Sequence, residues 1–261
     1  MKIVVCIKQV PESNNVKFDP VTHNLMRGGM SGRINPFDKN AIEAALRLRD
    51  AVGGEVALLS MGPDSTAEIL RDGLAMGADS AYLLSSRAFA GADTLSTGYV
   101  LAQAVRQIGN VDLTLLGRQA VDADTGQVGP IMAVNLNQPQ ATYATQLTAN
   151  GNQLTVVRDL DSLTQTVELT LPAVVTVRAE ANTPRYETPL HIQQSFEKQV
   201  TIWRDTDLAL DPAKLGQTGS PTVVRKVYAP EAKTRAQQPL ASEPAAAVDQ
   251  LLVIMQQHGL I

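Results

Sequence analysis

Residues 117–130, GRQAVDADTGQVGP, place glycines, acids and a threonine in one short stretch. This stretch follows an apolar run that ends at Leu116 and precedes apolar positions at Ile131, Val134 and Leu136, so we expect a loop between a strand and a helix. The start of a helix presents free backbone N–H groups and a partial positive charge, which together favour an anion such as phosphate. The sequence therefore predicts an anion site at this loop.

The side chains of the loop indicate which groups of a ligand it could contact. Gly126 and Gly129 let the backbone approach a phosphate closely, and Thr125 can donate from its hydroxyl. Asp122 and Asp124 would repel a phosphate, so we expect them to cap the helix or to accept from ribose hydroxyls. The loop matches neither G-x-G-x-x-G nor G-x-x-x-x-G-K-[ST]. Residue chemistry alone leaves two alternatives, a nucleotide site and an ordinary capped turn.

No set of catalytic or metal-binding residues emerges elsewhere. The histidines His23, His191 and His258 are scattered and share no metal-ligand spacing, so we expect no metal site. Cys6 lies in the apolar run KIVVCI, which is typical of a buried strand thiol. Asp93-Thr94 indicates first a helix cap, with a nucleotide contact by Thr94 as the alternative.

Composition excludes several classes of protein. The net charge of −4 argues against binding to nucleic acid, and no stretch approaches the roughly 20 apolar residues of a membrane helix, so we expect no membrane insertion. A single cysteine permits no internal disulfide and suits a reducing compartment. The apolar run at the N-terminus is too short for a signal peptide. We therefore expect a cytoplasmic protein.

The first 140 residues alternate strand and helix signals. Apolar runs predict strands at residues 3–7, 55–62, 80–85 and 111–116. Predicted helices begin at Asn35 with Pro36 in the first turn, at the Ser65/Glu68 capping box, and at Asp93 or Thr94, the last with Leu95, Ala102, Val105 and Ile108 on one side. This order predicts an α/β fold whose parallel sheet has helices on both faces and binds ligands beyond the carboxyl ends of the strands.

The pattern changes after Pro139. Residues 141–159 predict a hairpin that turns at Asn150-Gly151, and two further strands follow before residue 179. Residues 182–240 show no sustained periodicity, and residues 244–257 predict a last helix. We expect an α/β nucleotide-binding domain at residues 1–190 and an extended arm with a C-terminal helix at residues 191–261. The long connection from Glu12 to Ile34 contains glycines and is a candidate binding flap.

Several stretches together resemble one family. They are IVVCIKQVP, INPFDKNAIEAALRLRD, MGP with LRDGLAMGAD, GRQAVDADTGQVGP and LPAVVTVRAEANTPRY, in this order along nearly the whole chain. Their combination resembles the beta (small) subunit of electron-transfer flavoproteins. The resemblance implies a Rossmann-like domain of the adenine nucleotide alpha hydrolase-like type and an arm that packs on the alpha subunit. It also implies AMP in ordinary members and a second FAD in electron-bifurcating ones.

The resemblance assigns cofactor contacts by motif. They are Cys6, Lys8, Gln9, Val10, Asn35, Pro36, Phe37, Asp38, Met61, Ala120, Val121, Asp122, Ala123, Asp124, Thr125, Gly126, Gln127, Val128, Gly129, Pro130 and Ile131. The same edge of the sheet adds Thr94, Gly117 and Arg118 as candidates. Arg118 could meet a phosphate, a ribityl chain or a flavin ring, or it could pair with Asp122.

The resemblance also implies partners. Residues after Pro184 match the family's recognition loop, which docks dehydrogenases such as those acting on acyl-CoA. Its candidate docking residues here are Tyr186, Pro189, Leu190 and Ile192, with only Lys198 positive nearby. The stretches KQVP, RAFAGADT and DTGQVGP are similar to members that carry FAD in this subunit, which implies NADH as donor and ferredoxin or flavodoxin as a low-potential acceptor.

Alternatives of other classes remain at this stage. The absence of a catalytic set suits an electron carrier, in which the cofactor performs the chemistry. An ordinary member would instead hold structural AMP and would not bifurcate. A stand-alone nucleotide-binding protein of the universal-stress type is a further alternative, although Ala120 breaks its glycine pattern. An ATP-pyrophosphatase-type enzyme is another alternative, but this sequence lacks the S-G-G-x-D-S loop that such enzymes have after the first strand.

Overall fold

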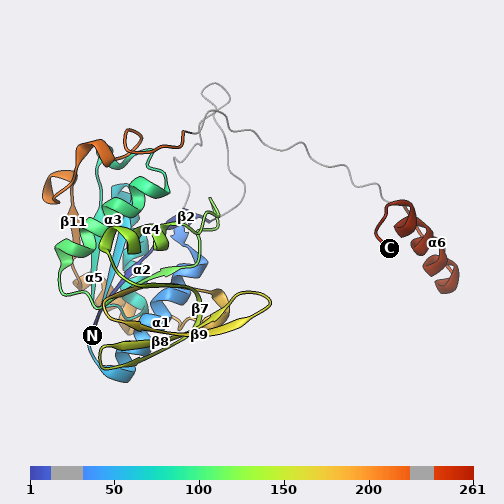
Figure 1. Ribbon diagram of the computed structural model, residues 1–261, viewed down its shortest axis with the longest axis horizontal. Coiled ribbons are helices and arrows are strands. Elements are labelled where there is room, and N and C mark those ends of the chain that lie inside the picture. The colour runs from blue at the N-terminus through green and yellow to red at the C-terminus, as the bar shows by residue number, and fades with distance from the viewer. Residues whose placement is uncertain (13–31, 224–237) are drawn as a thin grey trace. The chain divides into compact units, whose positions relative to one another are not determined.

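The computed structural model describes residues 1–12, 32–223 and 238–261 (Figure 1). Most of the expected flap and part of the expected arm, residues 13–31 and 224–237, lie outside the described residues. The chain divides into two compact units, Met1–Arg225 and Lys226–Ile261. The first unit contains the α/β fold and the second contains a helix.

The strands follow the expected order and extend it. In chain order they are β1 (Lys2–Cys6), β2 (Gln9–Pro11), β3 (Gly32–Ile34), β4 (Glu55–Met61), β5 (Ser80–Leu84), β6 (Leu113–Gly117), β7 (Gln140–Asn150), β8 (Gln153–Asp159), β9 (Thr164–Thr170), β10 (Ala173–Val177) and β11 (Val200–Trp203). The helices are α1 (Pro36–Val52), α2 (Ala67–Met76), α3 (Thr94–Ile108), α4 (Val128–Leu136), α5 (Pro189–Glu197) and α6 (Pro244–Gln257).

The described strands form a nine-stranded sheet and a separate ribbon. The order in the sheet is β11-β5-β4-β1-β6-β10-β7-β8-β9, and every pairing from β11 to β7 is parallel. Strands β7, β8 and β9 then pair antiparallel, so the predicted hairpin is confirmed as an extension of the sheet. Strands β2 and β3 pair antiparallel at the two ends of the long connection. The predicted α/β class and parallel sheet are confirmed.

Helices cover both faces of the sheet because successive side chains of a strand point to opposite sides. Ile3 and Val5 of β1 pack with residues of α1 and α2, whereas Val4 and Cys6 pack with residues of α3 and α4. All four are buried, which explains the uninterrupted apolar run in the sequence.

The helix starts expected at Asn35, with Pro36 in the first turn, and at Asp93 are confirmed, but three finer expectations are wrong. Asn35 occupies the N-cap position of α1, but its side chain makes no capping hydrogen bond. Thr66, the last residue of a short 3-10 turn, occupies the N-cap position of α2, so the predicted Ser65/Glu68 capping box does not form. In α3, Asp93 is the cap, and the side chain of Leu95 is exposed rather than on the buried side.

The first compact unit continues past the boundary expected at residue 190. Strand β11 pairs in parallel with β5 through residues such as Ile202 opposite Leu83, and Trp203 packs against Tyr82 with ring centroids 4.8 Å apart. Residues 191–203 therefore contribute a helix and a sheet strand to the α/β unit. The signals for α5 and β11 are short, which is why periodicity missed them.

The predicted C-terminal helix is confirmed as α6. Within the described part of the second unit, none of its residues is buried, and Val248, Leu251 and Leu252 are exposed apolar side chains. An apolar helix without a core of its own is typical of a segment that packs on another chain.

Candidate functional site

The candidate site lies where the order of the parallel strands changes direction. From β1 the chain proceeds to β4 and β5 on one side, and then crosses over to β6 on the other side of β1. Ligands of open α/β sheets bind beyond the carboxyl ends of the strands at such a switch point. The segments that follow β1 and β6 contain Lys8 and residues 117–130, so the structure brings these predicted stretches together.

Asn35 ties the loop at residues 117–130 to the start of α1. Its amide donates to the carbonyl of Gln119 over 2.8 Å, and its carbonyl accepts the N–H of Val121 over 3.1 Å. Asn35 is fully buried, whereas Val121, at the other end of the second bond, is exposed. This use of both ends of the amide explains why the side chain does not cap α1.

The acids of the loop form contacts other than those expected. Lys8 pairs with Asp122 over 2.7 Å, and Asp124 accepts a hydrogen bond from the amide of Gln119. Neither acid caps α4, so that expectation is wrong; their use toward ribose hydroxyls stays a prediction. The backbone of Asp124 and of Gly126 is left-handed, with φ of 57° and 62°.

Arg118 does not pair with Asp122. Its guanidinium donates to the side chain of Gln119 and lies near two aromatic rings, 6.0 Å from the centroid of Phe37 and 5.7 Å from that of Tyr143. Tyr143 has a φ of 61°, which is rare for an aromatic residue, and its N–H donates to the hydroxyl of Thr176. Sequence reasoning missed Tyr143, because nothing in its local sequence indicates a left-handed residue beside this loop.

The start of α4 is available to an anion. Gln127 occupies its N-cap position, and among the described residues no side chain makes a capping hydrogen bond there. The side chain of Gln127 instead accepts from the hydroxyl of Thr94 over 2.8 Å, which links α4 to the start of α3. The free N–H groups of this first turn are the donors that an anion would use.

Asp38 connects the ends of the two central strands. Its carboxylate accepts the N–H of Lys8 over 2.7 Å and the N–H of Gly117 over 3.1 Å. Burial raises the pKa of Asp38 to about 7, against hydrogen bonds from Asn35 and these N–H groups that favour ionisation. Burial and the nearby charge of Asp38 raise the pKa of the Cys6 thiol, so Cys6 is neutral and suited to packing rather than to nucleophilic chemistry.

The remaining cofactor candidates fall around these groups. Gln9 accepts from the hydroxyl of Thr66 over 2.8 Å, Val10 is buried in β2, and Met61 is the last residue of β4. The loop positions Ala120, Ala123 and Thr125, with Val128, Gly129, Pro130 and Ile131 of α4, follow β6 along the same edge. Pro36 starts α1, and Phe37 contacts Arg118.

The candidate docking residues surround α5. Tyr186 and Leu190 are 88% and 60% exposed, and Ile192 is 45% exposed. Phe196, which sequence reasoning did not select, is 68% exposed and lies under the guanidinium of Arg71 at 5.5 Å. The unusual exposure of large apolar side chains on one short helix fits an interaction surface.

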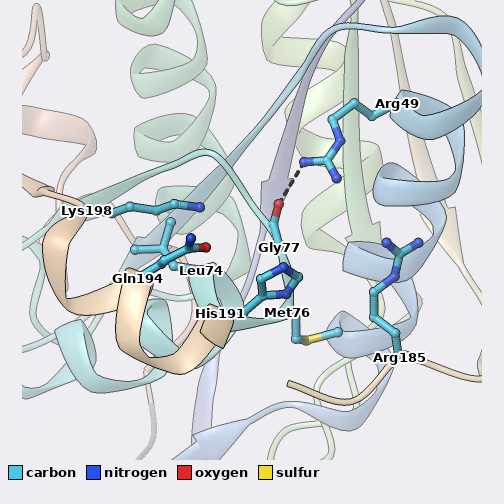
Figure 2. Close-up of a pocket in the computed structure, with 8 residues that line it drawn as sticks. All are labelled: Arg49, Leu74, Met76, Gly77, Arg185, His191, Gln194 and Lys198. Carbon is cyan, nitrogen blue, oxygen red and sulfur yellow. Dashed lines mark hydrogen bonds between the residues drawn. The ribbon is translucent and has the colours of Figure 1, made fainter. Parts of the chain in front are cut away.

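A separate small cavity of about 120 Å³ lies against α5, and its lining residues are other than the candidate cofactor residues (Figure 2). His191, Gln194 and Lys198 face it from the α5 side, and Arg49 donates to the carbonyl of Gly77 across it over 2.7 Å (Figure 2). Its arginines already hold carboxylates: Arg49 pairs with Asp79 and Arg185 with Glu43. We assign it to the anchoring of α5 rather than to a ligand.

Comparisons with known proteins identify the family. The model of the electron transfer flavoprotein domain matches residues 22–208. The chain is 44% identical over 237 residues to the electron transfer flavoprotein subunit beta of Megasphaera elsdenii, covering 88% of each chain. The chain belongs to the electron-transfer flavoprotein beta subunit family.

Other relatives in the family have different contexts. Subunit CarD of the caffeyl-CoA reductase-Etf complex of Acetobacterium woodii is 44% identical over 234 residues, with 89% of each chain covered. Protein FixA of Azorhizobium caulinodans is 43% identical over 242 residues, with 89% of this chain and 86% of the relative covered. As a beta subunit, the chain acts in electron transfer within a complex, which implies an electron-transfer flavoprotein alpha subunit as its partner.

Within the described residues, no helix is long and apolar enough to cross a membrane. In the same part of the chain, no cluster of three or more His, Cys, Asp or Glu side chains could hold a metal ion.

Proposed function

We propose that this chain holds FAD at residues 117–130 and is the NADH-oxidising side of a bifurcating electron-transfer flavoprotein in the cytoplasm. The observation that supports it is the convergence, at the switch point of the sheet, of an uncapped helix start, a left-handed glycine and the Lys8 ammonium. Family members bind FAD or AMP in this subunit, so an AMP-holding, non-bifurcating subunit is the second candidate.

The residues fit a dinucleotide. The first turn of α4 and the hydroxyl of Thr125 supply donors for phosphate, and Gly126 adopts a φ of 62° that a side chain would resist. Polar contacts of Asn35 and Asp122 hold the loop in place before a ligand binds, so binding costs little conformational entropy of the loop. When bound, a flavin would accept two electrons from a hydride donor and release them one at a time.

The side chains around the site have binding and positioning roles in this proposal. Arg118, near the rings of Phe37 and Tyr143, presents a cation and aromatic faces beside the loop, which suits a planar aromatic ring such as the isoalloxazine of FAD or the adenine of AMP. Cys6, being neutral and buried, takes no part in covalent chemistry. No residue of this chain needs to exchange electrons itself.

The partners follow from the surfaces and the relatives. The second compact unit, with exposed apolar side chains on α6, would pack on the alpha subunit. The exposed residues Tyr186, Leu190 and Ile192, with Pro189 starting α5, would dock a dehydrogenase acting on acyl-CoA or a related ester. The membership of CarD in a caffeyl-CoA reductase complex supports a partner of this class. Ferredoxin or flavodoxin would accept the second electron.

A count of cofactors tests the proposal. The complex with the alpha subunit is purified and denatured, and the released FAD and AMP are measured by chromatography. We expect two FAD per heterodimer and bleaching of the flavin absorbance by NADH. One FAD with one AMP would establish the second candidate instead, and two FAD without bleaching by NADH would refute the NADH site.

A further inference from the structure

Asp38 is buried beneath the backbone of the candidate cofactor site. It lies in the first turn of α1, is 5% exposed, and accepts the N–H groups of Lys8 and Gly117. Lys8 follows β1 and Gly117 ends β6, the neighbouring strands at the switch point. One carboxylate therefore sets the spacing between two segments that are far apart in the sequence.

The shape of Gly117 provides a second observation. A Cβ atom on Gly117 would lie 2.3 Å from Oδ1 of Asp38 and 2.7 Å from the carbonyl carbon of Phe37. Such distances do not occur between real atoms, so the carboxylate reaches this N–H only because residue 117 has no side chain. Gly117 and Asp38 thus form a matched pair, independent of any ligand.

The charged and titratable groups around Asp38 come from the neighbouring segments. The Cys6 thiol and the Lys8 ammonium lie at the end of β1, and Lys8 pairs with Asp122 of the loop after β6. The side chain of Asn35 also donates to Asp38. The Lys8 ammonium favours ionisation of Asp38, and it is shared with Asp122.

We propose that Asp38 is a positioning residue for the cofactor: its ionised carboxylate fixes the Lys8 and Gly117 backbones, and its neutralisation weakens cofactor retention. This inference rests on the proposed function, because it assumes a nucleotide at residues 117–130. Asp38 acts through backbone that it holds, and it need not touch the cofactor.

The charge of Asp38 makes retention depend on pH. With a pKa of about 7, Asp38 is mostly ionised at pH 8 and mostly protonated at pH 6. Protonation turns one carboxylate oxygen into a hydroxyl, which accepts an N–H group much more weakly than a charged carboxylate oxygen does. Cofactor affinity should therefore fall as the pH is lowered through 7.

The variant Asp38→Asn tests this without changing the size of the side chain. The amide that this variant introduces keeps one acceptor oxygen and places its N–H groups against a backbone N–H, in the same way as the protonated acid places its O–H there. The control is Glu43→Gln, because Glu43 is a buried acid of the same helix that binds Arg185 and Arg47 instead of the cofactor segments. The dissociation constants of the full chain for FAD and for AMP are measured by equilibrium dialysis between pH 6 and 8.

At pH 8, Asp38→Asn should bind about tenfold more weakly than the wild type, the effect of losing one charge-assisted hydrogen bond. At pH 6 this ratio should shrink severalfold, because the wild-type carboxyl is then neutral. The ratio cancels the titration of the AMP phosphate itself, whose second pKa is near 6. Glu43→Gln should keep the wild-type profile.

The outcomes separate this inference from the proposed function. Equal affinities of the wild type and Asp38→Asn at pH 8, or a wild-type affinity that rises on acidification, would overturn the role of Asp38 while leaving the nucleotide site intact. A wild type that holds neither nucleotide would overturn the proposed function and this inference with it. Should Asp38→Asn not fold, the comparison of the wild type with Glu43→Gln decides: a wild-type profile that is flat from pH 8 to 6 refutes the inference.

Discussion

The substitution Asn35→Ala offers a direct measure of how the loop at residues 117–130 is held. It removes the donor to Gln119 and the acceptor for the N–H of Val121, at 2.8 Å and 3.1 Å, and also the hydrogen bond to the carboxyl of Asp38. Each neutral hydrogen bond contributes roughly 1 kcal/mol and one to a carboxylate somewhat more, so the free energy of unfolding should fall by about 3 kcal/mol. Because Val121 is exposed, water can replace part of the lost bonding, which keeps the cost near this value.

A matched control separates loop positioning from general stability. Asn40, also buried in α1, donates to the carbonyls of Ala179 and Asn182 on a different side of the helix, at 3.1 Å and 2.8 Å. Asn40→Ala should therefore lower the free energy of unfolding by a similar amount. Only Asn35→Ala should loosen the loop at residues 117–130. If the loop must then be ordered when the nucleotide binds, the free energy of ordering is subtracted from the binding free energy, and binding weakens by roughly ten- to thirtyfold.

The assay combines urea unfolding, hydrogen exchange and nucleotide binding for both variants. We expect similar unfolding midpoints, faster amide exchange at residues 119–126 in Asn35→Ala alone, and weaker nucleotide binding in Asn35→Ala alone. If Asn35→Ala and Asn40→Ala bind the nucleotide equally well, Asn35 stabilises the fold without positioning the loop, and our reasoning about the site is refuted.

Three other perturbations test other parts of the structure. Gly126→Val should reduce nucleotide retention, because the φ of residue 126 is 62° and valine resists this conformation, whereas Gly126→Asn should retain more nucleotide, because asparagine tolerates it. Released nucleotide is measured by chromatography. Equal losses in the two variants would argue against backbone strain as the cause. Deletion of residues 226–261 should weaken binding to the alpha subunit without shifting the thermal unfolding of the first unit, and unchanged affinity would refute the role of the arm. Burial opposes ionisation of Glu43, but hydrogen bonds from Arg185 and Arg47 outweigh it and keep the pKa of Glu43 below its ordinary value. This lowered pKa stabilises the fold above about pH 4.5 and is lost as the pH falls further, so Glu43→Gln should show a flatter acid-unfolding curve than the wild type, and parallel curves would contradict the ion pair.

Sequence patterns predicted the strands and helices in which most side chains are buried. Strands β1, β4, β5 and β6 read as apolar runs because both of their faces are covered, and Asn150-Gly151 marked the hairpin because its turn needs left-handed backbone, seen at Gly151 with a φ of 59°. The edge strand β11 was missed. It is four residues long, and what stabilises it is pairing with β5, more than a hundred residues earlier in the chain.

The candidate site shows the same division. The loop at residues 117–130 and its place at the sheet edge followed from glycines and element order. The partners of its side chains did not follow, because Lys8 meets Asp122 and Asn35 meets Val121 only after the sheet has brought β1, α1 and β6 together. Local rules suggested instead that Asn35 and the loop acids cap helices, a use that competes with these long-range contacts.

The positioning role that we propose for the buried carboxylate of Asp38 would oppose stability at neutral pH. Its pKa is about 7 in the folded protein against an ordinary value of 3.8, so the folded state binds this proton more tightly than the unfolded state. The resulting stabilisation is complete below about pH 4 and is lost as the pH rises through 7, a difference of about 4 kcal/mol. An apolar residue at position 38 would avoid this cost but would leave the N–H groups of Lys8 and Gly117 unpaired. The carboxylate can approach only because position 117 is glycine, so Asp38 and Gly117 together form an arrangement that costs stability. Packing of the core does not require this arrangement. A site that must hold two strand ends at a fixed spacing does require it, which explains why it is present.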